Sequence, residues 1–323
     1  MQQQQPPSTM SKQYQVAIVG AGVMGQRMLA VLEQHSRFTP VAFYEPGTTA
    51  DIVMQDSGRA LRRADSLQDL FNTRGLDLLY IASPPAAHLD AVHAAVAAGI
   101  PCLCEKPLAN TVASALAIHA QVSASGLPFA VNFPFARAEG PGKLMDLVAT
   151  DALGDITSAR LRVRFARWPR AWQAGATSWL EGPSEGGFTR EVLSHFIFLA
   201  HRLFGPSQVE VDEIVRGAKG TETLLKARLR HANVTTEIDC AVEGDIVDDN
   251  RFEVTGTAGS AVLTEWFKLR HGGTTYGPGQ ASVRTLDAAA RLLEGDASSR
   301  LATASEALEV VQRVEALLAS QGR

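Results

Sequence analysis

The sequence predicts an α/β fold in which a parallel-sheet domain is followed by an α+β domain with a mainly antiparallel sheet. Strand and helix patterns alternate over residues 14–107, and a glycine-rich turn joins the first strand to the first helix. Residues 209–270 instead form strand after strand with short connections, which is typical of antiparallel sheets. The length of 323 residues also favours about two domains over a single core.

The first strand and helix carry a phosphate-binding pattern. The run YQVAIVG (14–20) is a short apolar strand, and residues 24–35 show the apolar spacing of a helix. Between them GAGVMG gives G-x-G-x-x-G, whose glycines allow a tight turn, approach of a pyrophosphate and close helix packing. The helix N-terminus then faces the phosphates. We therefore predict dinucleotide contacts from Gly20, Gly22, Val23, Met24 and Gly25.

The second strand, PVAFYE (40–45), ends in an acid about 20 residues beyond the last glycine, where a ribose-binding carboxylate belongs. Glu45 is predicted to accept hydrogen bonds from the ribose hydroxyls and to repel a 2′-phosphate. This favours NAD as the cofactor, with NADP still possible. The alternative is that Glu45 only begins a turn with Pro46 and Gly47.

The alternation continues through the rest of the first half. We expect a helix at 66–73 capped by Ser66, a strand at 76–85, a helix at 86–99 and a strand at 100–107. The carboxyl ends of parallel strands meet at one edge, where ligands bind. The residues after these strands are therefore predicted to complete the cofactor crevice; they are Ser83, Pro84, His88, Glu105 and Lys106.

Lys106 stands at the mouth of this predicted crevice, directly before Pro107. A lysine there can hold a substrate oxygen or transfer a proton. The alternative is a solvated surface lysine, the usual environment of this residue. Pro107 restricts the backbone of its neighbour, which favours a defined position for Lys106.

The segment GGFTREVLSHF (186–196) places Glu191 four residues before His195. We expect a helix to begin near Thr189, with Thr189 as its N-cap, so that the acid and the imidazole share one face. The pair could be catalytic, metal-binding or a buried salt bridge. Two ligands rarely suffice for a metal, so no metal site is predicted.

Three segments together resemble the glucose–fructose oxidoreductase, inositol dehydrogenase and rhizopine-catabolism (Gfo/Idh/MocA) family. They are AIVGAGVMG (17–25), IASPPAAHLDAVHAAVAAGIPCLCEKPLA (81–109) and EGGF with the following Glu and His (185–195). The resemblance implies a Rossmann domain over 13–133 and a substrate-binding and oligomerisation domain over 134–323 with a large open sheet. It also implies hydride transfer between nicotinamide and a carbonyl, hydroxyl or imine carbon.

The resemblance also implies roles for single residues. Lys106 matches the lysine that orients substrate or moves a proton, and His195 matches the usual acid/base histidine. Glu191 stands where the family has aspartate, and we expect it to orient the imidazole and raise its pKa. Leu193 and Phe198 replace a frequent Gly and a frequent Asp. The predicted catalytic residues are Lys106, His195 and Glu191.

The loop over residues 165–187 contains three of the four tryptophans of the chain. Its aromatic rings could stack on a ring-shaped substrate, close over the cofactor or fill the junction between the domains. The strand before it alternates, so Arg160, Arg162 and Arg164 share one face, which is either solvated, a subunit contact or a wall for an acidic substrate. Substrate contacts are predicted for Trp168, Arg170, Trp172 and Arg190.

Composition narrows the class of protein. A net charge of −4 disfavours nucleic-acid binding, and no apolar run approaches the length of a membrane span. Three cysteines without a framework spacing indicate free thiols, and residues 1–12 read as a disordered tail without a signal peptide. We expect a cytoplasmic homodimer or homotetramer, joined through the open sheet and acting on a small molecule. The alternative is a non-catalytic NAD(H)-binding sensor.

Overall fold

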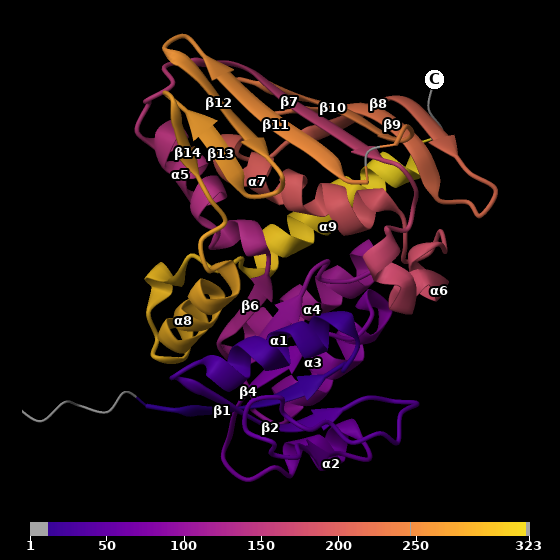
Figure 1. Cartoon of the computed structure of the whole chain (residues 1–323), viewed down its shortest axis with the longest axis vertical. Coiled ribbons are helices and arrows are strands. Elements are labelled where there is room, and N and C mark those ends of the chain that lie inside the picture. Colours follow the sequence, from indigo (N-terminus) through magenta and orange to yellow (C-terminus); the bar gives the residue numbers. More distant parts are fainter. Residues whose placement is uncertain (1–11, 246, 321–323) are drawn as a thin grey trace, which may run out of the picture.

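The computed structural model describes residues 12–245 and 247–320, which form two sheet domains stacked along the long axis of the molecule (Figure 1). The tail predicted over residues 1–12 lies outside the described residues except for Lys12. The N-terminal domain occupies one end, and the larger sheet occupies the other with helices between them.

The N-terminal sheet has six parallel strands in the order β3-β2-β1-β4-β5-β6, which is the Rossmann order. Its strands are β1 (Tyr14–Val19), β2 (Phe38–Tyr44), β3 (Arg62–Arg63), β4 (Leu76–Ile81), β5 (Cys102–Glu105) and β6 (Phe129–Asn132). Its helices are α1 (Val23–Gln34), α2 (Leu67–Phe71), α3 (His88–Ala97) and α4 (Val112–Ser125). The parallel sheet expected from the alternating pattern is confirmed.

Local chemistry accounts for these elements. The central strands β1 and β4 are apolar and buried, as strands covered by helices on both faces must be. The Ser66 hydroxyl accepts a hydrogen bond from Asp69 N at 3.0 Å, so the predicted cap of α2 is confirmed. The other buried strands follow the same rule.

The second sheet has eight strands in the order β14-β13-β12-β11-β7-β10-β9-β8. Every pairing is antiparallel except that of β7 with β10, so the mainly antiparallel sheet is confirmed. The strands are β7 (Ile156–Phe165), β8 (Gln208–Arg216), β9 (Glu222–Arg230), β10 (Thr235–Val242), β11 (Asp249–Gly256), β12 (Gly259–Thr264), β13 (Lys268–His271) and β14 (Thr274–Tyr276). Strands β12 and β13 are separated at Glu265 and Trp266, which adopt left-handed φ angles of 47° and 68°.

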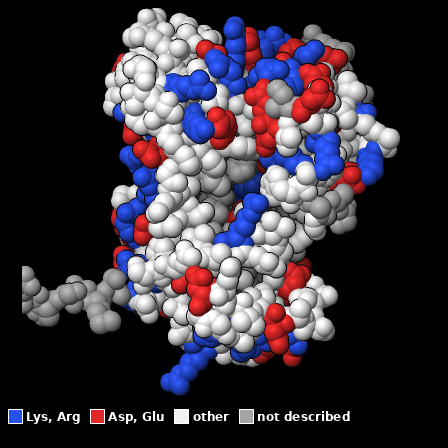
Figure 2. Space-filling model, viewed as in Figure 1, with Lys and Arg blue, Asp and Glu red and all other residues white. Residues whose placement is uncertain are grey.

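Helices cover only the inner face of this sheet. Helices α5 (Glu139–Ala149), α7 (Ser194–Phe204) and α9 (Ala304–Ala319) lie between the sheet and the Rossmann domain (Figure 1). On the outer face Arg160, Arg162 and Arg164 pair with acids of neighbouring strands, Glu237, Asp249 and Asp239. Figure 2 shows basic and acidic side chains interspersed on the visible face of the second domain. The predicted basic strand face is therefore part of a charge-compensated surface.

The C-terminal segment returns to the first domain. Helix α8 (Ala281–Leu293) packs into the same core as Leu29 and Leu32 of α1. Helix α9 is capped by a Thr303–Glu306 capping box and contacts both α4 and α7. Helix α9 therefore packs between the two domains.

Candidate active site

A cavity of about 300 Å³ lies between the two domains at the carboxyl ends of the parallel strands. The second domain contributes Trp172, Gln173, Trp179, Leu180 and Glu191 to its lining. The Rossmann domain contributes most of the residues predicted from the strand ends; they are Gly20, Gly22, Val23, Met24, Glu45, Ser83, Pro84, Glu105 and Lys106. Folding thus brings these residues into one crevice.

The three glycines of the first turn have different surroundings. Gly20 has a left-handed φ of 91°, and a Cβ there would lie 2.4 Å from Ser83 N. A Cβ on Gly25 would lie 2.0 Å from the Gly20 carbonyl oxygen. A Cβ on Gly22 would meet no atom within 4 Å. The first and third glycines are needed by the fold itself, while the second leaves open space on the cavity wall.

Glu45 lies beside this turn. Its Oε2 accepts a hydrogen bond of 2.7 Å from Ala21 N, which fixes the carboxylate at the cavity edge. The alternative role, a residue that merely begins the next turn, does not account for this contact. A carboxylate held here places negative charge next to the helix terminus that would receive a pyrophosphate.

Glu105 is the last residue of strand β5. Its carboxylate accepts hydrogen bonds from the Tyr80 hydroxyl and, at 2.8 Å, from Asn132 Nδ2. Burial raises the pKa of Glu105 despite these bonds. The side chain is 5% exposed, so it forms part of a buried polar wall below the cavity.

Lys106 and Glu191 form an ion pair between the domains. Lys106 Nζ donates to Glu191 Oε2 at 2.7 Å and to the Glu191 carbonyl oxygen at 2.8 Å. The side chains are 8% and 17% exposed, so the pair is largely withdrawn from solvent. Lys106 is therefore not the solvated surface lysine that the sequence left open.

A polar network extends from this pair into the second domain. Gln173 Nε2 donates to Glu191 Oε1 at 3.3 Å, and Arg170 Nε donates to Gln173 Oε1 at 3.0 Å. The Arg170 guanidinium also lies 3.7 Å from Glu191 Oε1 and 3.0 Å from Asp248 Oδ2. Arg170 thus neutralises two carboxylates and holds the carboxylate that binds Lys106.

His195 is separated from this network. Its ring is 9% exposed, and Nδ1 has no hydrogen-bond partner among the described residues. The rings of Phe133, Phe135 and Trp266 surround it at centroid distances of 6.1, 5.5 and 5.7 Å. Burial, followed by the positive charges of Lys106 and Arg170, holds the pKa of His195 well below its ordinary value.

The expectation that Glu191 orients His195 and raises its pKa is therefore wrong. Residues Thr189–Leu193 form a π-helical turn before α7, and this wider turn breaks the spacing that places residues four apart on one face. The predicted Thr189 N-cap is also wrong, since Thr189 lies inside the turn and its N–H donates to Glu222 Oε1 at 2.6 Å. Glu191 consequently meets Lys106 instead of His195.

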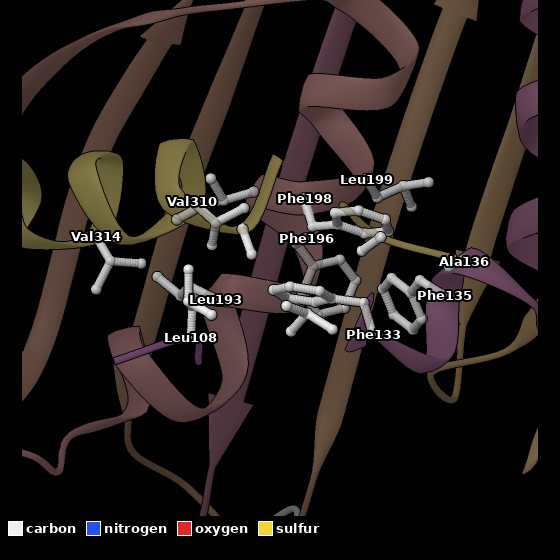
Figure 3. Close-up of a cluster of buried hydrophobic side chains, with 14 of the residues drawn as sticks. Leu108, Phe133, Phe135, Ala136, Leu193, Phe196, Phe198, Leu199, Val310 and Val314 are labelled. Atoms are coloured by element: carbon white, nitrogen blue, oxygen red, sulfur yellow. The ribbon is translucent and has the colours of Figure 1, made fainter. Parts of the chain in front are cut away.

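Phe198, which replaces a polar residue of the family pattern, belongs to the core. Its ring stacks on Phe133 at a centroid distance of 4.5 Å. Figure 3 shows Phe133, Phe135, Phe196 and Phe198 gathered in one cluster between the domains. Phe133 thus stacks on Phe198 and also lies beside His195.

Six predicted site residues lie outside the cavity lining; they are Gly25, His88, Trp168, Arg170, Arg190 and His195. Arg190 pairs with Glu315 at 2.7 Å and donates to the Pro183 carbonyl, so it ties its helix to α9. His88 is fully buried, and its ring nitrogens lie 2.9 and 3.2 Å from the Ser83 and Leu108 carbonyl oxygens. Trp168 is partly buried in the core.

Trp172 both lines the cavity and bridges the domains. The Arg27 guanidinium of α1 lies 4.6 Å from its ring centroid, and that of Arg170 lies 4.8 Å away. The sequence analysis missed Gln173 and Asp248. Gln173 follows Trp172, a predicted substrate contact, so its position in the sequence could have indicated a role in the site. Nothing in the sequence around Asp248 indicates such a role.

Within residues 12–245 and 247–320, no group of three or more His, Cys, Asp or Glu side chains is placed to hold a metal ion. None of the helices in the same ranges combines the length and apolarity that crossing a bilayer requires.

The free energy of unfolding is expected to decrease as the pH falls below about 6.5, the ordinary pKa of histidine. Burial lowers the pKa of His88, and burial with two nearby cations lowers that of His195. The unfolded chain then binds protons that the folded chain does not. Each ring therefore lowers the free energy of unfolding by up to about 1.4 kcal/mol for each pH unit below its ordinary pKa. Thermal unfolding from about pH 7.5 to 5.5 measures this, and His195→Gln should flatten the dependence. If the stability of His195→Gln depends on pH as steeply as that of the wild type, the role given to His195 is contradicted.

A Rossmann domain whose nucleotide crevice faces a second sheet domain defines a two-domain dinucleotide-binding protein. Residues 14–133 match the oxidoreductase family with an NAD-binding Rossmann fold, and residues 142–262 match the GFO/IDH/MocA C-terminal domain. The chain belongs to the Gfo/Idh/MocA family of NAD-dependent oxidoreductases.

The curated relatives align over part of their length. Inositol 2-dehydrogenase 1 of Saccharopolyspora erythraea is 35% identical over 34% of this chain and 34% of its own. Inositol 2-dehydrogenase of Paracoccus denitrificans is 30% identical over 48% of this chain and 46% of its own. The chain therefore spans less than half the length of these relatives.

Solved structures match over nearly the whole chain. GenD2 from gentamicin A biosynthesis, crystallised with NAD, has a TM-score of 0.77 and 21% identity over 96% of this chain and 94% of its own. The WlbA dehydrogenase of Chromobacterium violaceum, crystallised with NADH and UDP-GlcNAcA, has a TM-score of 0.81 and 17% identity over 97% and 94%. At these identities the likeness shows the shared fold.

Proposed function

We propose that this chain is an NAD-dependent oxidoreductase that interconverts a carbonyl or imine group and the corresponding alcohol or amine, with Lys106 transferring the proton. The observation that carries the proposal is the Lys106–Glu191 ion pair, which is withdrawn from solvent at the inner end of the nucleotide crevice. A non-catalytic NAD(H) sensor has no need for such a pair.

The residues of the crevice fit a dinucleotide. Gly22 is the N-cap of α1 and leaves open space on the cavity wall. Because it has no side chain, no side-chain cap occupies the N-terminus of α1. A pyrophosphate would therefore be held by the backbone N–H groups of this turn. Glu45 would accept the ribose hydroxyls and would repel a 2′-phosphate, which favours NAD over NADP.

The proposed reaction balances in the reducing direction. When bound, the nicotinamide ring supplies a hydride to the carbonyl carbon and takes it back in oxidation. Lys106 donates one proton to the carbonyl oxygen, so the π bond breaks and an alcohol forms. An ammonium has three N–H donors, and Glu191 accepts two of them, which leaves one for the substrate oxygen.

His195 has a different role in this proposal. Because burial and two cations disfavour its charged form, the ring stays neutral at physiological pH. It would position the substrate through one hydrogen bond instead of accepting the proton as the sequence pattern suggested. The unpaired Nδ1 supports this role.

We extend the proposal to a cytoplasmic homodimer or homotetramer. Helices cover the inner face of the second sheet, which leaves the outer face free for a second copy. All three cysteines are free and buried, which suits a reducing compartment.

Fluorescence titration with NADH and NADPH tests the cofactor assignment. We expect the wild type to bind NADH at least about tenfold more tightly than NADPH, because Glu45 repels the 2′-phosphate. Glu45→Gln keeps an acceptor but removes the charge, so it should narrow this difference. Glu253→Gln, on the outer sheet face, is the matched control and should keep it. Failure of the wild type to bind NADH overturns the proposed function.

A further inference from the structure

The charges, hydrogen bonds and ring surfaces of the crevice define the class of its substrate. We infer that the substrate is an uncharged ring-bearing ketone or secondary alcohol with few hydroxyl groups, rather than a polyol or an acid. This inference rests on the proposed function, because it concerns what is reduced or oxidised beside Lys106.

The charges of the crevice disfavour an acidic substrate. Lys106 is the single cation among the described residues that line the cavity, and its ammonium is already paired with Glu191. Arg170 lies behind this lining and is paired with Asp248 as well as Glu191. A carboxylate or phosphate on the substrate beside Lys106 would therefore meet no unpaired cation, while the carboxylate of Glu191 would repel it.

Few hydrogen-bonding groups remain unpaired around the cavity: the third donor of Lys106, the Ser83 hydroxyl and His195 Nδ1. Lys106 has one free donor after its two bonds to Glu191, and Gln173 uses its carbonyl oxygen for Arg170 and one N–H for Glu191. Both carboxylate oxygens of Glu191 are engaged. A ring with a hydroxyl on every carbon would lose its water without regaining enough partners, which costs binding energy for each unpaired group.

The remaining walls are aromatic or aliphatic. Trp172, Trp179 and Leu180 line the cavity on the side of the second domain. Beyond it the neutral ring of His195 lies among Phe133, Phe135 and Trp266. Flat aromatic faces bind flat or cyclic apolar bodies well. A molecule with one polar group near Lys106 and an apolar ring against the tryptophans fits these walls.

Three alcohols that share a six-membered ring test this inference with NAD⁺ as the oxidant. They are cyclohexanol, with one hydroxyl; myo-inositol, with a hydroxyl on every carbon; and 3-hydroxycyclohexanecarboxylate, with a charge. We expect kcat/KM for cyclohexanol to exceed both others by at least about tenfold, since an apolar pocket discriminates against an added hydroxyl by up to about 10²-fold. NADH formation measures the rates.

Two variants of Trp179 test whether its ring binds the substrate ring. Trp179→Ala should lower kcat/KM for cyclohexanol by at least about tenfold, mainly through KM, whereas Trp179→Phe should keep most of it. The small activity toward myo-inositol should change less in both variants. Calorimetric titration of the NAD⁺-loaded protein with cyclohexanone, a pair that cannot exchange a hydride, measures ring binding separately from turnover.

The outcomes separate the inference from the proposed function. Preferred turnover of myo-inositol or of the carboxylate overturns the inference and supports the oxidoreductase. If NADH binds but cyclohexanone neither binds saturably nor is reduced, the inference is also overturned. If NADH itself does not bind, the proposed function fails and the inference fails with it.

Discussion

Replacement of Lys106 by alanine is expected to lower kcat by about 10²–10⁴-fold, the usual contribution of a positioned proton donor. The affinity for NADH should change little, because the glycine turn and Glu45 are untouched. The variant leaves Glu191 with Gln173 and Arg170 as partners, so the folded state keeps a neutralised carboxylate. The rate of NADH consumption measures the loss, with the best substrate from a screen of ketones, imines and oxidised sugars.

Two further variants sharpen this test. Lys106→Arg keeps a positive charge and N–H donors, but a guanidinium does not release a proton in proteins. It should therefore remain as inactive as the alanine variant if Lys106 transfers the proton, and should recover activity if Lys106 only orients the substrate. Lys143→Ala on α5, outside the cavity lining, is the control that should keep full activity. Near-normal turnover of Lys106→Ala would contradict the proposed role.

Gly22→Ala and Gly25→Ala are expected to have opposite effects on stability and cofactor binding. A Cβ at Gly22 meets no protein atom, so the melting temperature should stay unchanged while NADH affinity falls at least about tenfold, because the methyl occupies the approach of the pyrophosphate. A Cβ at Gly25 would lie 2.0 Å from a backbone oxygen, so the fold should lose about 1–3 kcal/mol.

Thermal unfolding and NADH titration of the same two samples provide the measurements. The two glycines lie three positions apart in one turn, so each variant is the control for the other. Wild-type NADH affinity in Gly22→Ala would show that the pyrophosphate does not pass this residue. Wild-type stability in Gly25→Ala would show that the turn has room that the structure lacks.

Much of the first domain follows from local patterns. The glycine turn, the buried strands and the Ser66 cap are each specified by a few adjacent residues, so they could be predicted without tertiary information. The meeting of Glu45 and Lys106 at one crevice also follows, because parallel strands must end at the same edge. The π-helical turn over Thr189–Leu193 has no comparable local signal.

The candidate site was only partly predictable for the same reason. Lys106 and Glu191 were both identified, but sequence spacing paired Glu191 with His195, whereas the packed domains pair it with Lys106. Asp248 precedes strand β11 and joins the site from far along the chain, where nothing in the neighbouring sequence marks it.

The amino-acid sequence alone allowed the family resemblance, the Rossmann turn and the charged residues of the crevice to be predicted. Each of these is carried by short segments of the chain. The assembled domains set which charge meets which, and how deeply each is buried. Electrostatic partners depend on distances between segments remote in sequence, and desolvation depends on everything packed around them. Burial therefore leaves His195 neutral among aromatic rings and makes Lys106–Glu191 the charged pair of the crevice.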